Sequence, residues 1–228
     1  KFIAIIKENR KCVSLGIATG RRIDSALAIM KKHGIPRPDV LISSLGTRIH
    51  YGQNLTEDDF WADHIDHDWT PRRINKLLSE LPGLARQPKS EQTPFKISYY
   101  YDENKAPGLD EIITLIRHKE ITANVILSFG QFLDVIPSRA SKGQALRYVA
   151  QGLEIPLEHT LVAGGSGADE DMMRGNTLAV VVENRHHEEL SQLDDVDRIY
   201  FAGQSHASGI MEALEHYDFF NACKVPNA

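Results

Sequence analysis

The sequence has 228 residues, of which 42% are hydrophobic and 25% are charged, a composition typical of globular chains and not of disordered ones. This length suits one large domain, or one domain with a sizeable insertion. The formal net charge of -5 argues against non-specific nucleic-acid binding, which needs a basic face. No apolar run approaches the ~20 residues of a membrane span, so no membrane partner is expected. Cys12 and Cys223 lie far apart in sequence, and we expect a reduced, cytoplasmic protein.

Strands and helices alternate in the first part of the predicted fold. Apolar spacing predicts a short amphipathic helix at residues 2–10, a buried strand at 12–18, a helix at 22–33 and a strand at 40–42. This rhythm favours parallel pairing with right-handed crossovers. The sequence opens on Lys1 instead of methionine, and we expect it to be part of a longer chain.

The pattern changes after Gly46. Residues 47–51 alternate with a period of two, and the polar stretch 52–68 predicts a long loop. Thr70-Pro71 is a typical helix start, with a capping hydroxyl followed by proline. A helix to residue 81, a strand at 95–101, a helix at 109–117 and strands at 125–129 and 132–136 follow. We therefore predict that residues 69–137 form an inserted α+β cap.

Alternation returns after the cap, with a helix opening at Lys142 and strands at 161–163, 178–182 and 199–201. Residues 1–68 and 138–228 are therefore predicted to form one α/β, Rossmann-like core that the cap interrupts. Ligands of such folds bind at the carboxyl ends of the strands, so we expect the site between core and cap.

Two segments carry groups suited to a phosphate. Thr19 ends a predicted strand and precedes Gly20, so its hydroxyl could donate to a phosphate oxygen that the backbone also approaches. A plain capping threonine is the alternative. Lys142 follows Ser141 at a helix start, where a cation is mildly disfavoured by the helix dipole unless it meets an anion. A solvated lysine is the alternative.

Two further segments are candidates for ligand contacts. The turn from Gly164 to Asp171 carries carboxylates after a strand, which suits a hard cation such as Mg²⁺, although an acidic helix start would look the same. Lys96 interrupts the apolar face of an aromatic strand and is a candidate to meet a polar ligand. The run from Asp63 to Asp68 is interpreted as a solvated connector, and His186-His187 as a helix start.

In their order, these motifs resemble those of the haloacid-dehalogenase superfamily of phosphohydrolases, sucrose-phosphate phosphatase type. Thr19-Gly20-Arg21 resembles the second family motif and Ser141-Lys142-Gly143 the third. The segments 45–49 and 95–99 resemble the entry to the cap and its first long strand, and 164–171 takes the place of the fourth motif. The segments 163–173 and 184–190 look most like the phosphatase-like C-terminal region of bacterial sucrose-phosphate synthases.

The resemblance implies a role for each matched residue. Thr19 and Lys142 are the implied catalytic residues, and Asp169 is the implied metal ligand. The implied substrate-binding residues are Gly20, Arg21, Thr47 and Lys96. The implied partners are a sugar phosphate such as sucrose-6-phosphate and a glycosyltransferase domain in the same parent chain.

Two departures from the family pattern limit the implied function. The family's first motif is a pair of aspartates, one of them the nucleophile, after an N-terminal strand, and no such motif occurs here. In the fourth motif Gly165 and Ala168 stand where the family has aspartate and asparagine, so Mg²⁺ should bind weakly or not at all.

Two functions are therefore open. The chain is either a degenerate phosphatase-like domain of a sucrose-phosphate synthase, with a sugar-phosphate-binding, regulatory or docking role, or an active Mg²⁺-dependent sucrose-6-phosphate phosphatase. The second function requires an Asp-x-Asp nucleophile motif upstream of residue 1.

Overall fold

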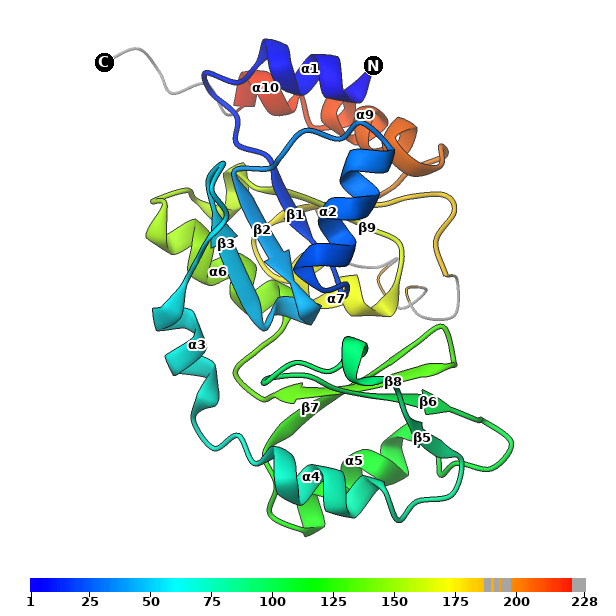
Figure 1. Cartoon of the computed structure of the whole chain (residues 1–228). Helices are drawn as coiled ribbons and strands as arrows, with labels where there is room; N and C mark the ends of the chain where they lie inside the picture. The colour runs from blue at the N-terminus through cyan, green and yellow to red at the C-terminus, as the bar shows by residue number, and fades with distance from the viewer. Residues whose placement is uncertain (187–189, 191–192, 194–197, 223–228) are drawn as a thin grey trace.

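The structure is a computed structural model that describes residues 1–186, 190, 193 and 198–222. Its strands form three sheets, two in the upper part of Figure 1 and one in the lower part. The first sheet contains β1 (Gly16–Ala18), β2 (Val40–Ser43), β3 (Arg48–Tyr51) and β4 (Thr56–Glu57), and the second contains β9 (Leu161–Gly164), β10 (Leu178–Val181) and β11 (Ile199–Phe201). The third contains β5 (Leu84–Arg86), β6 (Ile97–Tyr101), β7 (Ala123–Ser128) and β8 (Phe132–Pro137).

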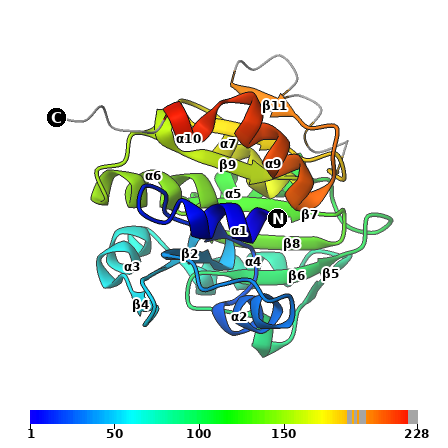
Figure 2. The same cartoon turned by 90° about the horizontal axis from the view of Figure 1, so that it is seen from above.

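Helices cover these sheets in both views (Figures 1 and 2). The α-helices are α1 (Phe2–Glu8), α2 (Ile23–Lys32), α3 (Asp59–Asp66), α4 (Pro71–Leu78), α5 (Leu109–His118), α6 (Lys142–Gly152), α7 (Glu170–Met173), α9 (His206–His216) and α10 (Phe219–Ala222). Short 3₁₀ turns are η1 (Ser44–Gly46), η2 (Lys89–Glu91), η3 (Leu157–His159) and η4 (Gly167–Asp169). Among the described residues, no helix is both long and apolar enough to cross a membrane.

The parallel pairing predicted for the core is confirmed. β1 pairs with β2 in parallel, and β10 pairs in parallel with both β9 and β11. The two core sheets are not joined, since no ladder connects β1 to β9 among the described residues. Ala18 and Leu146 nevertheless pack against the apolar clusters of both sheets. β1 and β9 are therefore neighbouring edge strands with unpaired sides.

The third sheet is antiparallel, in the order β5-β6-β8-β7, and all its strands lie within the range predicted for the cap. The exact boundaries of core and cap stay a prediction. One face packs on α4 and α5 through an apolar cluster that includes Ile97, Tyr99 and Leu133. Alternation along the strands places Ile126 and Ile136 on the other face, where both pack in the core cluster of the first sheet. The second face of the cap sheet therefore looks toward the core.

The prediction of a long loop at residues 52–68 is wrong, because β4 and α3 lie in this stretch. The Asp58 side chain accepts a hydrogen bond from the Trp61 backbone N–H and so caps α3. Trp61 and Ile65 are four residues apart and both are buried in the core cluster. In the sequence, Trp61 and Ile65 lie among acidic and histidine residues, so the stretch has a mainly polar pattern that does not indicate a helix.

Other element predictions differ in detail. β5 was not predicted, and β1 is shorter than residues 12–18. The expected cap by Thr70 does not form, since its hydroxyl is buried without a partner among the described residues. Cys223 and His187 lie outside the described residues.

Gly46 fixes the position of the first sheet against α6. Its φ is +91°, and an added Cβ would lie 2.1 Å from the Ser141 carbonyl oxygen. No other residue type fits this close backbone contact without a shift. The turn after β2 therefore depends on glycine to touch the start of α6.

Replacement of Gly46 should test this contact. Gly52 has a φ of +66° but nothing within 4 Å of an added Cβ, so Gly52→Ala measures the cost of left-handed φ alone, about 1 kcal/mol. We expect Gly46→Ala to lower the free energy of unfolding by at least about 3 kcal/mol, because overpacking adds to that cost. Urea denaturation measures the free energy of unfolding of both variants. Equal losses in Gly46→Ala and Gly52→Ala would contradict the close contact.

Candidate functional site

Thr19 lies at the carboxyl end of β1, as predicted. Its backbone N–H donates to the Ile42 carbonyl at 2.9 Å, and its carbonyl accepts from the Leu45 N–H at 3.1 Å. The Thr19 Oγ1 accepts a hydrogen bond from the Arg21 N–H at 3.2 Å, which leaves the hydroxyl hydrogen available for donation. Gly20 is half-buried and the Arg21 side chain is exposed. This turn is therefore open to a ligand.

Thr47, in contrast, is 1% exposed. Its hydroxyl donates to the Ser44 carbonyl at 2.9 Å and so stabilises the turn η1 from within. Two hydroxyls that the sequence did not single out lie where β2 meets this turn. They belong to Ser43, the last residue of β2, and Ser44, the first residue of η1. Both are buried and lack a partner among the described residues, and no sequence signal distinguishes them from ordinary strand serines.

Lys142 and Asp169 form the best-defined contact of the site. The Lys142 Nζ donates to the Asp169 Oδ1 at 2.7 Å, and the two side chains are 8% and 13% exposed. The other carboxylate oxygen, Oδ2, accepts from the Gly165 N–H, the Ser166 N–H and the Ser166 Oγ, at 3.1, 3.1 and 3.0 Å. Donors of the chain itself therefore occupy both oxygens of Asp169.

These contacts set the charge state of Asp169. Burial by itself would raise the pKa of the Asp169 carboxyl, but the charge and hydrogen bond of Lys142, together with Gly165 and Ser166, outweigh burial. The pKa lies below the ordinary value of 3.8. The Asp169 carboxyl is therefore ionised at neutral pH.

Lys96 lies on the face of the cap sheet that looks toward the core. The side chain is 4% exposed, and its Nζ donates to the Ser98 Oγ at 2.5 Å and to the Asp134 Oδ1 at 3.1 Å. Ser98 and Asp134 are also cross-strand partners, and neither was predicted as a site residue. Among the described residues, no hydrogen bond or ion pair joins Lys96 to Thr19 or Lys142.

A cavity of about 390 Å³ lies between β7 of the cap and the start of α6. The core contributes Leu45, Lys142 and Ala168, and the cap contributes Asn124 and Ile126. Leu45 is also the backbone partner of Thr19. Lys142 therefore lines the space between core and cap, whereas Thr19 does not line it and is linked to it only through the backbone of Leu45.

The described residues do not fit a magnesium site. Gly165 offers no side-chain oxygen, and both oxygens of Asp169 are engaged by donors. No group of three histidine, cysteine or carboxylate side chains suited to a metal ion occurs in the described part of the chain. Mg²⁺ takes oxygen ligands in near-octahedral geometry, and a single carboxylate that is paired with lysine does not supply them.

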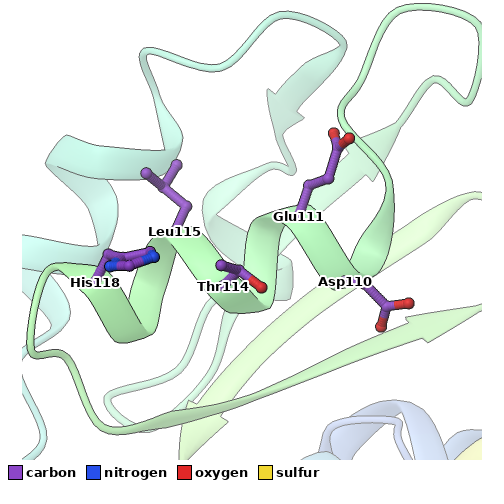
Figure 3. Close-up of a pocket in the computed structure, with 5 residues that line it drawn as sticks. All are labelled: Asp110, Glu111, Thr114, Leu115 and His118. Carbon is purple, nitrogen blue, oxygen red and sulfur yellow. The ribbon is translucent and has the colours of Figure 1, made fainter.

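Two other regions hold polar groups without the geometry of a site. A hollow in the cap is lined by Asp110, Glu111, Thr114, Leu115 and His118, and Figure 3 shows that all five side chains project from α5 alone. The acidic run from Asp63 to Asp68 includes exposed residues of α3. Neither region brings side chains from separate elements together.

Asp169→Asn is expected to lower the free energy of unfolding at pH 7 by about 3 kcal/mol, because it leaves Lys142 buried without its counter-charge. Because the pKa of Asp169 is lower in the folded state than the ordinary value of 3.8, the charged carboxylate stabilises the fold above pH 3.8. This stabilisation is lost as the pH falls through the pKa of the folded state. The stability curves of wild type and variant should therefore converge below pH 3.8. Asp102→Asn, in the exposed pair with Lys105, is the matched control and should change nothing measurable.

Comparison with known proteins identifies several relatives. The chain is 28% identical over 200 residues to mannosylfructose-phosphate phosphatase of Agrobacterium fabrum. The alignment covers 87% of this chain and 81% of the relative. It is 29% identical over 229 residues to sucrose-phosphatase 1 of Nicotiana tabacum, which covers 96% of this chain. This chain spans only 54% of that plant protein, about half its length.

The solved structures agree with the fold. The sucrose-phosphatase of Synechocystis sp. PCC6803, solved in complex with sucrose and phosphate, superposes with a TM-score of 0.90 at 31% identity, over 95% of this chain and 89% of that one. Haloacid-dehalogenase-like hydrolases superpose with TM-scores of 0.60–0.64 over 93–96% of this chain. The predicted haloacid-dehalogenase-like α/β fold with an inserted cap is therefore confirmed.

A sequence model of one family covers nearly the whole chain. It is described as sucrose-6F-phosphate phosphohydrolase and matches residues 1–218, which include the Thr19 turn, the cap and the Lys142–Asp169 pair. The chain therefore belongs to the sucrose-6F-phosphate phosphohydrolase family.

Proposed function

We propose that this chain is a sugar-phosphate-binding domain of the sucrose-phosphatase type in which phosphatase turnover is weak or lost. The observation that carries this proposal is the buried Lys142–Asp169 pair beside Gly165. The pair keeps the ammonium group of Lys142 next to the cavity and engages Asp169, the implied metal ligand of the fourth motif. Holding a phosphate needs donors and positive charge, whereas cleaving its ester also needs a nucleophile and a stabilised transition state.

Core and cap divide the binding role in this proposal. Thr19, the backbone after Gly20, Arg21 and Lys142 contact the phosphate, and Lys96 meets sugar hydroxyls from the cap. The position of Lys96 on the core-facing side of the cap sheet supports its role. Its two bonds to Ser98 and Asp134 hold the ammonium group in place without using all three of its hydrogens.

The parent protein is proposed to be a sucrose-phosphate synthase, in which this domain has a regulatory or docking role beside a glycosyltransferase domain. The resemblance of segments 163–173 and 184–190 to the C-terminal region of bacterial synthases supports this. A cytoplasmic location is part of the same proposal.

An active Mg²⁺-dependent sucrose-6-phosphate phosphatase is the second candidate function. The unpaired edges of β1 and β9 favour it, because a strand with an Asp-x-Asp motif from outside residues 1–228 would find hydrogen-bond partners on both sides there. Such a strand would bring the nucleophile that residues 1–228 lack in this position.

The residues 1–228 alone should release negligible phosphate from sucrose-6-phosphate in the presence of Mg²⁺. Without an aspartyl nucleophile there is no phosphoaspartate route, and Gly165 supplies no metal ligand. Phosphate release by a colorimetric assay checks this, with the full-length parent protein measured in parallel. Robust turnover by residues 1–228 that disappears in Asp169→Ala would contradict the proposal. Turnover by the parent protein alone would favour the second candidate.

Sucrose-6-phosphate should bind to the 228-residue chain, and calorimetry should separate the roles of core and cap. We expect Lys142→Ala to weaken both sucrose-6-phosphate and inorganic phosphate by at least about tenfold, because a charge-assisted hydrogen bond is lost. Lys96→Ala should weaken the sugar phosphate only. Lys105→Ala removes an exposed lysine of the cap and serves as the control. The roles assigned to Lys142 and Lys96 would be contradicted if millimolar sucrose-6-phosphate gave no heat of binding. They would also be contradicted if Lys142→Ala and Lys96→Ala had equal affinities for each ligand.

A further inference from the structure

Arg185 lies directly against the glycine that replaces the expected carboxylate. Its own N–H donates to the Val182 carbonyl at 3.1 Å, and the next residue, His186, donates its N–H to the Gly165 carbonyl at 2.8 Å. A Cβ added to Gly165 would lie 3.5 Å from the Arg185 Cα and 3.8 Å from its Cβ. The loop after β10 therefore places an arginine beside the vacant side-chain position of the fourth motif.

Among the described residues, the partner of the Arg185 guanidinium is an aromatic ring and not an acid. No ion pair joins Arg185 to a carboxylate among the described residues, and its guanidinium instead lies 5.0 Å from the centre of the Phe201 ring. Of the described acids near this loop, Asp169 pairs with Lys142 and Glu183 accepts from the Ser205 hydroxyl. Within the described part of the chain, the Arg185 guanidinium therefore has no carboxylate partner.

A buried donor of Arg185 also lacks a partner in the part of the chain that the structure describes. The Nε is buried and makes no hydrogen bond to any described residue. A buried donor without an acceptor costs free energy, and native proteins rarely leave one unsatisfied. A ligand with acceptor oxygens would remove this cost.

We propose that Arg185 is an anion-binding residue that holds an oxyanion, the phosphate group of a sugar phosphate, beside Gly165. The inference rests on the proposed function and adds a residue that no motif assigned. A guanidinium is always charged and presents donors in a fork that matches two phosphate oxygens. Arg185 thus supplies the positive charge that a metal ion would supply in a site with a carboxylate at position 165.

The position of Arg185 changes what a restored carboxylate would do. An added Cβ at Gly165 lies 3.2 Å from the Val182 Cγ2, so a small shift of that methyl group admits a larger side chain. A carboxylate introduced by Gly165→Asp would then lie next to Arg185 and pair with it. The substitution should therefore remove anion binding before it restores a metal site.

Calorimetry with inorganic phosphate in EDTA tests the inference on the 228-residue protein. We expect Arg185→Gln and Gly165→Asp each to weaken phosphate binding about tenfold, the first by removing the charge and the second by neutralising it. The double variant should be no weaker than either single variant, because both act on the same charge. Arg198→Gln removes an exposed arginine at the opposite end of β11 and should leave the affinity unchanged.

The outcomes separate this inference from the proposed function. Wild-type affinity in Arg185→Gln, with loss in Lys142→Ala, would overturn the role of Arg185 and leave the proposed function in place. Absence of phosphate binding in the wild-type protein would overturn both. If circular dichroism shows that Arg185→Gln does not fold, the test rests on Gly165→Asp. An unchanged phosphate affinity in Gly165→Asp would then overturn the inference.

Discussion

The ion pair of Lys142 and Asp169 is the interaction on which the site is built. Lys142 is the first residue of α6, where the helix dipole disfavours a cation, and its side chain is almost fully buried. Asp169 offsets both penalties, and it is held in turn by Gly165 and Ser166. The pair therefore joins the start of α6 to the turn after β9. Ser141 and Asp171 add a second side-chain hydrogen bond between the same two segments.

The cap depends on the same geometry. Ile126 and Ile136 of the cap sheet pack in the core cluster of the first sheet, while Lys96, Ser98 and Asp134 share that sheet face. Apolar contacts thus hold the cap on the core and leave a row of polar groups between them. The cavity beside Lys142 lies at this boundary.

Family membership and catalytic competence are separate properties of this chain. The chain belongs to the sucrose-6F-phosphate phosphohydrolase family. At the fourth motif, however, Lys142 engages Asp169, and Gly165 supplies no carboxylate for a metal ion. Lysine and arginine can balance the charge of a phosphate, but neither provides the nucleophile or the vacant coordination positions of a metal ion. A binding role is therefore compatible with the same architecture.

Much of the architecture followed from local sequence pattern. The alternation of apolar residues was enough for the parallel strands of the core and the main helices of the cap, because burial enforces a period of two in strands and 3.6 in helices. The failure at α3 shows the limit of this reasoning. Only two of its side chains, Trp61 and Ile65, reach the core, and a pattern of two residues cannot outweigh a polar background.

The sequence by itself determined the family, the order of its motifs and the absence of the family's aspartate at position 165 and asparagine at position 168, because these are properties of residue identity. Only the tertiary structure decided which groups meet. It paired Lys142 with Asp169 across 27 positions, turned the Thr47 hydroxyl into the turn η1 and placed Arg185 beside Gly165. The Lys142–Asp169 and Arg185–Gly165 contacts join segments that are distant in sequence. The parallel pairing of β9 with β10 brings the strand ends before Gly165 and Arg185 to one edge. The Thr47 contact is local, but only the fold shows that this side chain is buried.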